Sequence, residues 1–436
     1  MADPTGVPRP SRLIPRCGAD RGQRALVAAL ACALHLAILV PTIGQDAGSV
    51  QNDFAPQSIA IEGGDKPYRD QELEYPPLSI PVLMAPALTS EGIDGYNDHF
   101  EAWMLLFDLA IVALLAFAAP GGRNRAGPDR LRISGRDARA GGPRRGLAAV
   151  AVYSLGIVAL SGIVLGDSDI DEAPLALSRF DLVPAFLVLA AVLARESGRS
   201  ATWSALLATG VAVKAFPLAL FPALARDEPN PWRAALAAAV PLAVSVAVVV
   251  AFGDEFGSAI GYHAERSLQI ESVAATPLEL AYLDDVSAGA RFGSGSFNYV
   301  GPGSEVARAV TVAALIFLYG LVLLAGWRAR AISHLRLATA LLATIAILSP
   351  VLSPQFLFWL LPLSAAAFGL GAANWVLVAA FAATQLMLQQ YSRVVVDFDA
   401  EFVWRLAGRN ALLLAYLGLV VWPVLKEGLP APAGGT

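Results

Sequence analysis

Asp53 is the first residue along the chain whose type and position suit chemistry. It follows the apolar segment Ala25–Ile43 and stands in a polar stretch between two apolar segments. A carboxylate near a membrane surface can accept the proton of an attacking hydroxyl group. Most acids in such a loop are simply solvated, and position alone favours that interpretation for Asp53. Asp46 lies nearer to the apolar segment and competes for the same role.

The motif Glu74-Tyr75-Pro76-Pro77-Leu78 belongs to the same polar stretch, which runs from Asn52 to Pro86. Two consecutive prolines fix the backbone and hold the residues before them extended. Loops of this length are usually functional or disordered, and the Tyr, Pro and apolar residues argue against disorder. We therefore expect this stretch to form the lid and the catalytic edge of a site. Taken in isolation, the motif favours a simple turn where the chain re-enters the membrane.

The segment from Gly261 to Ser272 is the densest polar cluster of the chain. At helical spacing His263, Arg266 and Ile270 fall on one face. Arginine and histidine beside a membrane surface can hold a phosphate through charge-assisted hydrogen bonds. An interfacial amphipathic helix, whose arginine meets lipid headgroups, explains the same pattern, and both interpretations stay open.

Three further polar sites interrupt apolar segments. Lys214 lies within one, where a charge at membrane depth costs about 2.5–3.5 kcal/mol; we expect it to snorkel towards the cytoplasm or pair with an acid, far from an outer site. Arg179 and Asp181 flank Phe180 and either pair across a helix end or line the site. Gln355 either binds a sugar hydroxyl or caps a turn.

The sequence lacks the fingerprints of soluble nucleotide-dependent enzymes. It contains no P-loop, no Rossmann glycine pattern in context, no HExxH motif and no cysteine pairs for zinc. Its two cysteines, Cys17 and Cys32, stand in an arginine-rich tail and in an apolar run, so they imply no disulfide. A cytosolic ATP or nucleotide-sugar site is thereby disfavoured, and we expect no metal and no nucleic-acid partner.

The composition is that of a polytopic membrane protein. The chain is 56% hydrophobic and 15% charged, with a mean hydropathy of +0.57, whereas soluble domains are nearer 45–50% apolar and 25% charged. The apolar residues come in blocks of about twenty, the length that crosses a bilayer core. The frequent Ala, Arg, Gly and Pro with little Lys indicate a GC-rich bacterial genome, as in actinobacteria.

The charges of the loops assign them to the two sides of the membrane. The arginine-rich tail 1–24 and the loop 120–146, with eight arginines against two acids, are expected in the cytoplasm. The loop 44–98 has ten acids against two basic residues, and the loop 253–306 has eight against two, so both are expected outside. The first apolar segment is expected to be an uncleaved helix. Residues 25–425 then form one integral membrane domain, followed by a cytoplasmic tail, 426–436.

The apolar blocks predict about ten crossings, with an interfacial piece at Leu78–Leu88. They are expected at Ala25–Ile43, Ala102–Ala119, Leu147–Leu165, Leu182–Ala194, Ala234–Phe252, Ala309–Trp327, Leu337–Leu348, Phe356–Leu370, Trp375–Gln390 and Ala411–Leu425.

The apolar segment 201–225 is the exception to this count. As a full crossing it would place the arginine-rich loop that contains Arg328 on the outside, with no acid to compensate. Gly210, Pro217 and Pro222 break up the segment. We therefore expect a helical hairpin that enters from the cytoplasm and turns back.

Several ordered segments together are similar to one known family. They are Asp53 with the following Gly64, Tyr68 and Asp70; Glu74-Tyr-Pro-Pro-Leu78; Arg179-Phe-Asp181; Lys214-Ala-Phe-Pro217 with Pro222; Tyr262-His-Ala-Glu-Arg-Ser-Leu-Gln-Ile-Glu-Ser272; and Ser349-Pro350 with Ser353-Pro-Gln355. This set, spread over about residues 25–425, resembles glycosyltransferase family 87. The resemblance implies an all-α, GT-C-like membrane fold of about ten transmembrane helices plus re-entrant pieces, with the site formed by outer loops.

The resemblance also implies an activity and roles for residues. It implies an inverting hexosyltransferase that moves a sugar, typically mannose, from a polyprenyl-phosphate carrier to a glycolipid or glycan outside the cell membrane, among membrane lipids and without a cofactor. Asp53 matches the catalytic acid of the first outer loop. The donor phosphate would be held by His263, Arg266 and Arg291. The acceptor, the sugar or the walls of the site would involve Asp70, Glu74, Tyr75, Arg179, Asp181, Tyr262, Glu271 and Gln355.

Two other classes of function stay open. A lipid or small-molecule transporter or flippase would share the spans but would place its ionisable residues near mid-membrane, whereas most of them here lie in predicted outer loops. A non-catalytic scaffold would not need Asp53, His263 and Arg266 in such clusters.

Overall fold

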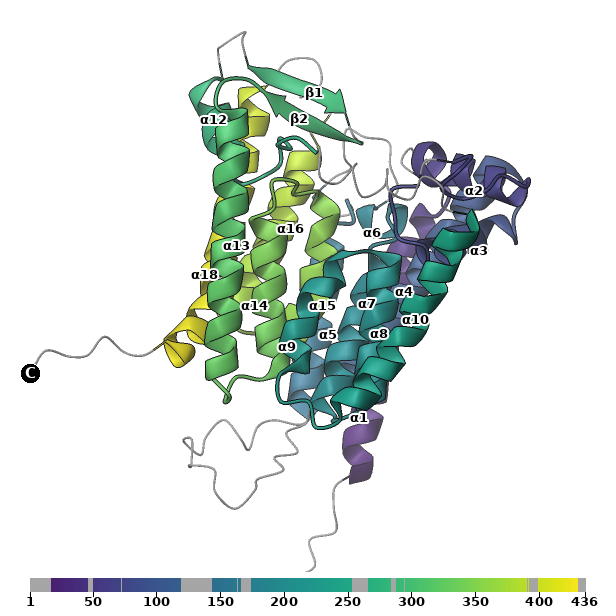
Figure 1. The fold of residues 1–436 in the computed structure, drawn as a ribbon, viewed down its shortest axis with the longest axis vertical. Helices are drawn as coiled ribbons and strands as arrows, with labels where there is room; N and C mark the ends of the chain where they lie inside the picture. Colours follow the sequence, from purple (N-terminus) through teal and green to yellow (C-terminus); the bar gives the residue numbers. More distant parts are fainter. Residues whose placement is uncertain are drawn as a thin grey trace, which may run out of the picture.

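The structure, a computed structural model, describes residues 17–45, 50–71, 73–118, 143–162, 164–165, 174–252, 266–283, 288–293, 295–389, 391 and 399–429. Helices make up most of these ranges, and the strands within them, β1 (Gly289–Gly293) and β2 (Ser296–Val300), pair antiparallel (Figure 1). The predicted all-α polytopic class is confirmed. The predictions for Asp46, Tyr262 and His263 lie outside the described residues, as do most of the loop 120–146 and the ends of both tails.

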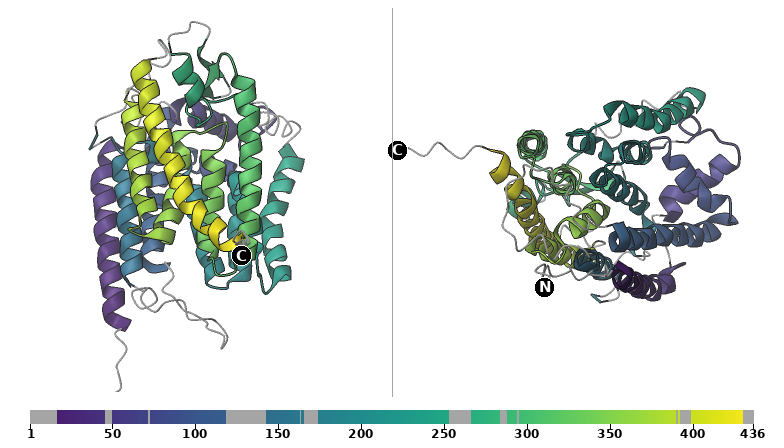
Figure 2. Two further views of the ribbon diagram at one scale, coloured as in Figure 1. Left: turned by 90° about the vertical axis from the view of Figure 1, so that its left-hand side faces the viewer. Right: turned by 90° about the horizontal axis from the view of Figure 1, so that it is seen from below.

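Five described helices are long and apolar enough to cross a membrane. They are α1 (Cys17–Leu39), α4 (Gly92–Ala118), α10 (Pro231–Phe252), α13 (Ser304–Arg328) and α18 (Ala400–Gly428). Their outer faces carry large apolar side chains, such as Val250 and Phe317, that are mostly exposed. Exposed apolar surface of this extent indicates contact with lipid. Figure 2 shows α1 at the edge of the bundle and α18, in yellow, running obliquely across one side.

The remaining predicted crossings correspond to shorter helices. They are α5 (Pro143–Ala159), α7 (Leu182–Glu196), α14 (His334–Ile347), α15 (Leu357–Phe368) and α16 (Ala372–Leu388). The 12 residues of α15 span about 18 Å at 1.5 Å per residue, well short of a bilayer core of about 30 Å. Most residues of α14 and α15 are buried. These interior helices are covered by protein, so they need not match the thickness of the lipid.

Short elements close the upper end of the bundle in Figure 1. The β1–β2 hairpin and α12 (Thr276–Ala281) lie on one side of this end, and α2 (Ala55–Glu62) and α3 (Ser79–Ala87) lie on the other. The described parts of the loops 44–98 and 253–306, both expected outside, therefore share one end of the molecule. The predicted interfacial piece Leu78–Leu88 is α3, whose Leu83 carbonyl accepts a hydrogen bond from the Tyr96 hydroxyl (2.9 Å).

A helical hairpin is present at 201–225, as predicted, and its entry from the cytoplasm stays a prediction. α8 (Ser200–Val213) rises to Lys214, and two short helices, η3 (Phe216–Leu220) and α9 (Phe221–Ala225), return to the lower end. A proline stands in the first turn of each return helix, where its missing N–H does no harm. Arg195 donates to the Arg226 carbonyl (2.7 Å), and the Arg226 guanidinium donates to the carbonyls of Gly326 and Ile332. The loop that begins at Arg328 thus lies at the same end as Arg195, as the charge pattern requires.

A buried polar network joins α1 to the bundle. His35 Nδ1 lies 2.5 Å from an oxygen of Asp108 on α4, and Nε2 lies 2.9 Å from the Ser154 hydroxyl on α5. The Tyr153 hydroxyl donates to the other Asp108 oxygen at 2.7 Å. The His35 and Asp108 side chains are fully buried. Ionisable groups inside a helix bundle must be paired in this way, because each is costly alone.

Replacing Asp108 with Ala should destabilise the protein by about 3–5 kcal/mol, because it leaves His35 buried without its charged partner. Thermal unfolding of the detergent-purified variant measures the loss. The matched control is Asp94→Ala, an exposed acid on the same helix, for which a change within about 0.5 kcal/mol is expected. Equal melting temperatures for the wild type and Asp108→Ala would show that the network does not hold α1.

Candidate functional site

Asp53 lies in a single helical turn, Val50–Phe54, at the upper end of the bundle. The next residue, Phe54, is buried and packs on the rings of Phe100 and Phe180, with centroids 5.3 and 5.7 Å away. This anchor holds the turn and leaves the Asp53 side chain 54% exposed. Its Oδ2 accepts a hydrogen bond from Arg179 Nη1 at 2.9 Å. The predicted base is therefore accessible and ion-paired.

Arg179 and Asp181 point to different partners, with the buried Phe180 between them. Arg179 has an extended backbone (φ −133°, ψ 138°) between α6 (Leu175–Ser178) and α7, and Asp181 stands at the N-cap of α7. Asp181 is buried, and its Oδ1 accepts hydrogen bonds from Lys214 Nζ (2.8 Å) and Trp359 Nε1 (2.6 Å). Of the two interpretations that the sequence left open, a pair between Arg179 and Asp181 across the helix end is wrong, because Arg179 pairs with Asp53 and Asp181 pairs with Lys214. That both residues line the site stays a prediction.

Lys214 pairs with an acid, as one of the two expectations had it, but the expectation that it lies far from the predicted site was wrong, because that acid is Asp181. α7 and α8 have 15 and 14 residues and pack side by side. Because they are antiparallel and nearly equal in length, the end of α8 meets the beginning of α7. The Lys214 ammonium also lies 4.8 Å from the Phe180 ring centroid and 5.5 Å from that of Tyr75, distances at which cation–π attraction acts.

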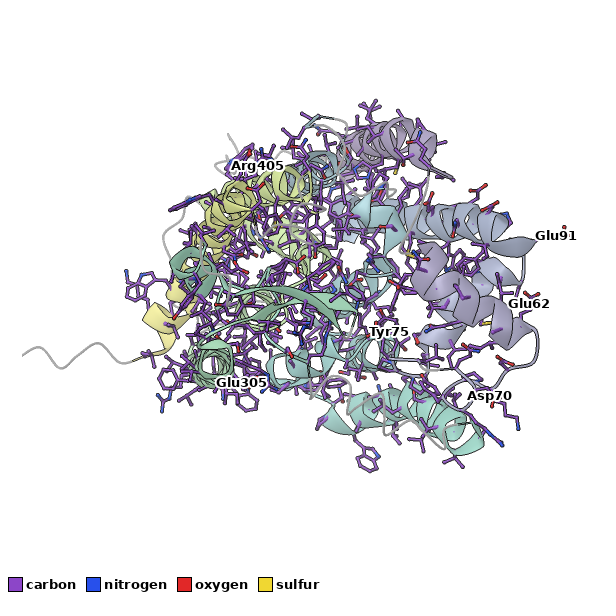
Figure 3. The ribbon with its side chains drawn as sticks, turned by 90° about the horizontal axis from the view of Figure 1, so that it is seen from above. Glu62, Asp70, Tyr75, Glu91, Glu305 and Arg405 are labelled. Carbon is purple, nitrogen blue, oxygen red and sulfur yellow. The ribbon has the colours of Figure 1, made fainter. Side chains whose placement is uncertain are left out.

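Tyr75 packs against Phe180 and the Lys214 ammonium. Its ring meets Phe180 edge to face, with centroids 4.7 Å apart. Burial raises the pKa of the Tyr75 phenol well above its ordinary value, and the Glu74 carboxylate, which is hydrogen-bonded to the phenol, raises it further. The Tyr68 hydroxyl donates to the Tyr75 carbonyl at 2.6 Å. The prolines of this motif thus hold Glu74 and Tyr75 against the site, and Figure 3 shows Tyr75 near the middle of the upper end.

An aromatic stack supports the Asp181–Lys214 pair from the other side. The Trp359 ring lies between the rings of Phe216 and Phe356, with centroid distances of 3.9 and 4.0 Å. Gln355 precedes Phe356 in the short helix η4 (Pro354–Phe356), and its side-chain oxygen accepts a hydrogen bond from the Ser353 hydroxyl. Gln355 therefore stands one residue from the stack. Sequence reasoning did not single out Trp359, which lies four residues after Gln355, and it named Phe216 only as part of the motif Lys214-Ala-Phe-Pro217.

Three charged residues of the predicted site, Asp70, Arg266 and Arg291, contact other parts of the chain. Asp70 accepts a hydrogen bond from the Lys66 backbone N–H (2.9 Å) and so closes its own turn; Figure 3 places it towards the rim, away from Tyr75. Arg291 is exposed on β1, opposite Asn298. Arg266 stands beside the same hairpin and donates to the Ser296 hydroxyl at 3.2 Å.

A second polar cluster lies under the β1–β2 hairpin around Glu271. The buried Glu271 carboxylate accepts a hydrogen bond from the Tyr391 hydroxyl (2.8 Å), and the Glu271 carbonyl accepts one from Arg409 of α18 (3.0 Å). Asn410 donates to the Thr276 hydroxyl at 2.7 Å. Arg409 escaped sequence analysis because the last crossing was expected to begin at Ala411, whereas α18 begins at Ala400. This cluster ties α18 to the segment that carries Arg266.

Burial dominates the acid–base behaviour of this cluster. It raises the pKa of Glu271 to about 7, although Arg409 and the Tyr391 hydroxyl favour the charged form. It raises the pKa of Glu279 well above 4.5, and the neighbouring Glu271 raises it further. Within the described ranges neither Glu279 oxygen has a hydrogen-bond partner, and no three His, Cys, Asp or Glu side chains are placed to hold a metal ion.

Comparison of the chain with protein-family models and with curated proteins finds no match. Among solved structures, ArnT from Cupriavidus metallidurans bound to undecaprenyl phosphate is similar to this chain, with 14% sequence identity and a TM-score of 0.46. The similarity covers 94% of this chain and 78% of that chain.

The buried Glu271 should make the protein less stable as the pH rises. Its folded-state pKa, about 7, lies above its ordinary value of 4.5, so the stability that its proton brings is present below about pH 4.5 and lost as the pH rises through about 7. Replacing Glu271 with Gln removes this titration. Relative to the wild type, the variant should gain up to about 3 kcal/mol between about pH 5 and about pH 8, measured by tryptophan fluorescence during thermal unfolding.

The matched control is Thr276→Val, which removes a hydrogen bond of the same cluster but no titratable group. It should shift the melting temperature by the same amount at every pH. If Glu271→Gln behaves in that way too, Glu271 does not titrate as its burial requires.

Proposed function

We propose that this protein is an inverting glycosyltransferase that moves a sugar from a polyprenyl-phosphate carrier to a hydroxyl group of a glycolipid or glycan. One observation carries the proposal: an accessible carboxylate, Asp53, is paired with the cation Arg179 at one end of a polytopic helix bundle. A second cation, Lys214, lies on the Phe180 ring, which also packs on Phe54 of the Asp53 turn. A carboxylate base with the cations Arg179 and Lys214, at the end of a bundle of lipid-facing helices, suits a donor whose polyprenyl tail stays in the membrane.

The chemistry requires two things of the site. The acceptor oxygen attacks the anomeric carbon while Asp53 takes the hydroxyl proton. The bond from that carbon to the phosphate oxygen breaks on the opposite face, so polyprenyl phosphate leaves with the electron pair and the configuration inverts. Because a phosphate is already a good leaving group, it needs positive charge more than a proton, and half-buried cations supply that field better than cations in water.

The cations of the two ion pairs, Arg179 and Lys214, change the expected assignment of roles. Arg179 and Lys214 are better placed for the donor phosphate than Arg291, which is exposed on β1. Arg266 remains a candidate through its place beside the Glu271 cluster, and His263 remains a prediction. Glu74 and Tyr75 are then placed to meet the sugar or the acceptor. The family resemblance supports mannose as the sugar and the extracytoplasmic side as the site of transfer.

A transporter is the second candidate, and the His35–Asp108 pair favours it because transporters place ionisable groups inside the bundle. Every ionisable group of that network is already saturated by its neighbours, however, and both side chains are fully buried. The accessible ion pair lies instead at the upper end, where a transferase needs it.

Replacing Asp53 with Asn should reduce sugar transfer by about 10²–10⁴-fold, the usual contribution of a general base. The measurement is transfer of radiolabelled mannose from polyprenyl-phosphate mannose to a lipid extract, in membranes that contain equal amounts of each variant. Asp70→Asn, an acid of the same loop that closes its own turn, is the matched control and should retain transfer.

Full transfer by Asp53→Asn would exclude Asp53 as the base. No transfer by the wild type from any of a panel of polyprenyl-phosphate sugars would overturn the proposed activity.

A further inference from the structure

The site contains two ion pairs whose charges cancel. Asp53 pairs with Arg179 at 2.9 Å, and Asp181 pairs with Lys214 at 2.8 Å. The Tyr75 ring contacts elements of both pairs, since its centroid lies 5.5 Å from the Lys214 ammonium and 6.3 Å from the ring of Phe54, the residue after Asp53. A site with two cations and two carboxylates attracts an anion weakly. A phosphate therefore binds well only when one cation leaves its carboxylate.

Burial decides which of the pairs can open. The Asp181 and Lys214 side chains are 2% and 14% exposed, and the Trp359 N–H also holds Asp181. Opening that pair would strand a buried carboxylate, which is strongly unfavourable. The Asp53 and Arg179 side chains are 54% and 22% exposed. Water can solvate Asp53 when that pair opens, and exposed ion pairs are weak.

We infer that Arg179 is a latch that moves from Asp53 to the phosphate of the lipid donor. Before the donor binds, an Asp53 oxygen is occupied by the Arg179 N–H. When the phosphate takes Arg179, that oxygen becomes free to accept the proton of the acceptor hydroxyl. Lys214 stays with Asp181 and adds its field to the same phosphate. This inference rests on the proposed function and adds an order of events to it. The donor binds first, and its binding frees the Asp53 oxygen to act as the base.

The backbone around Arg179 suits such an exchange. The buried Phe180 and the N-cap Asp181 fix the residues that follow Arg179, so only the side chain has to move. Phe54 anchors the Asp53 turn independently, through its contacts with Phe100 and Phe180. The two partners can therefore separate without a change in either backbone.

A thiol placed at position 53 reports whether Arg179 is beside it. In Asp53→Cys, with Cys17 and Cys32 replaced by Ser, the pKa of the introduced thiol is read from the pH dependence of its alkylation by iodoacetamide in nanodiscs. A neighbouring arginine lowers a thiol pKa below its free value of about 8.5. The probe is polyprenyl phosphate without sugar, whose binding is measured separately with radiolabel.

The latch predicts a low thiol pKa that rises by about one unit when polyprenyl phosphate binds. Adding Arg179→Ala should give a thiol pKa that is high from the start and unmoved by polyprenyl phosphate. A lipid that merely shields the thiol would slow alkylation at every pH and leave the pKa unchanged, which separates the two effects. Asp70→Cys, in the same loop, should not respond to the lipid.

Binding itself provides the second readout. Arg179→Ala, with Asp53 intact, should weaken polyprenyl phosphate binding at least about tenfold. Arg405→Ala, which removes an arginine from the exposed Arg405–Glu401 pair, is the matched control and should bind normally.

Two outcomes overturn the latch and leave the proposed function standing: the thiol pKa stays fixed although polyprenyl phosphate binds, or it is the same with and without Arg179. Failure of the wild type to bind polyprenyl phosphate overturns the donor class and the latch together.

Discussion

The ion pair between Asp181 and Lys214 is the interaction on which the rest of the site depends. It joins the beginning of α7 to the end of α8. The Trp359 N–H on α15 donates a second hydrogen bond to the Asp181 carboxylate. Because a charge inside a membrane bundle is costly without a partner, this pair sets how far the hairpin rises beside α7. Phe180 and Tyr75 then pack around the ammonium, and the Asp53 turn packs on Phe180.

The same constraint recurs in two other parts of the molecule. His35 and Asp108 hold α1 to α4, and Arg409 with Asn410 holds α18 to the segment around Glu271. In each case a polar side chain joins two elements. Lipid is as apolar as the helix surfaces, so apolar contacts alone do little to fix the height of one helix relative to the next. Buried polar pairs thus fix the relative heights of the helices, and apolar side chains form most of the contact surface between them.

The site differs from these buried pairs in one respect, which is exposure. The Asp53–Arg179 pair lies at the upper end, where water competes for both partners, whereas Asp181–Lys214 lies beneath it among aromatic rings. A buried pair keeps its geometry, and an exposed pair can change partners. Asp181 and Lys214 stand at the ends of α7 and α8, and the short helices α2, α3 and α12 with the β1–β2 hairpin close the upper end.

The sequence by itself determined the helical membrane class and the hairpin at 201–225, because apolar block length, arginine counts and proline positions are local properties. It also indicated Asp53, Tyr75, Arg179 and Asp181 as residues of interest. Only the tertiary structure decided which charges meet: Arg179 reaches Asp53 across 126 positions, and Trp359 reaches Asp181 across 178. Lys214 was misplaced and Arg409 was missed for the same reason. The partner of a charge depends on which helices pack together and at what height, and neither follows from local periodicity.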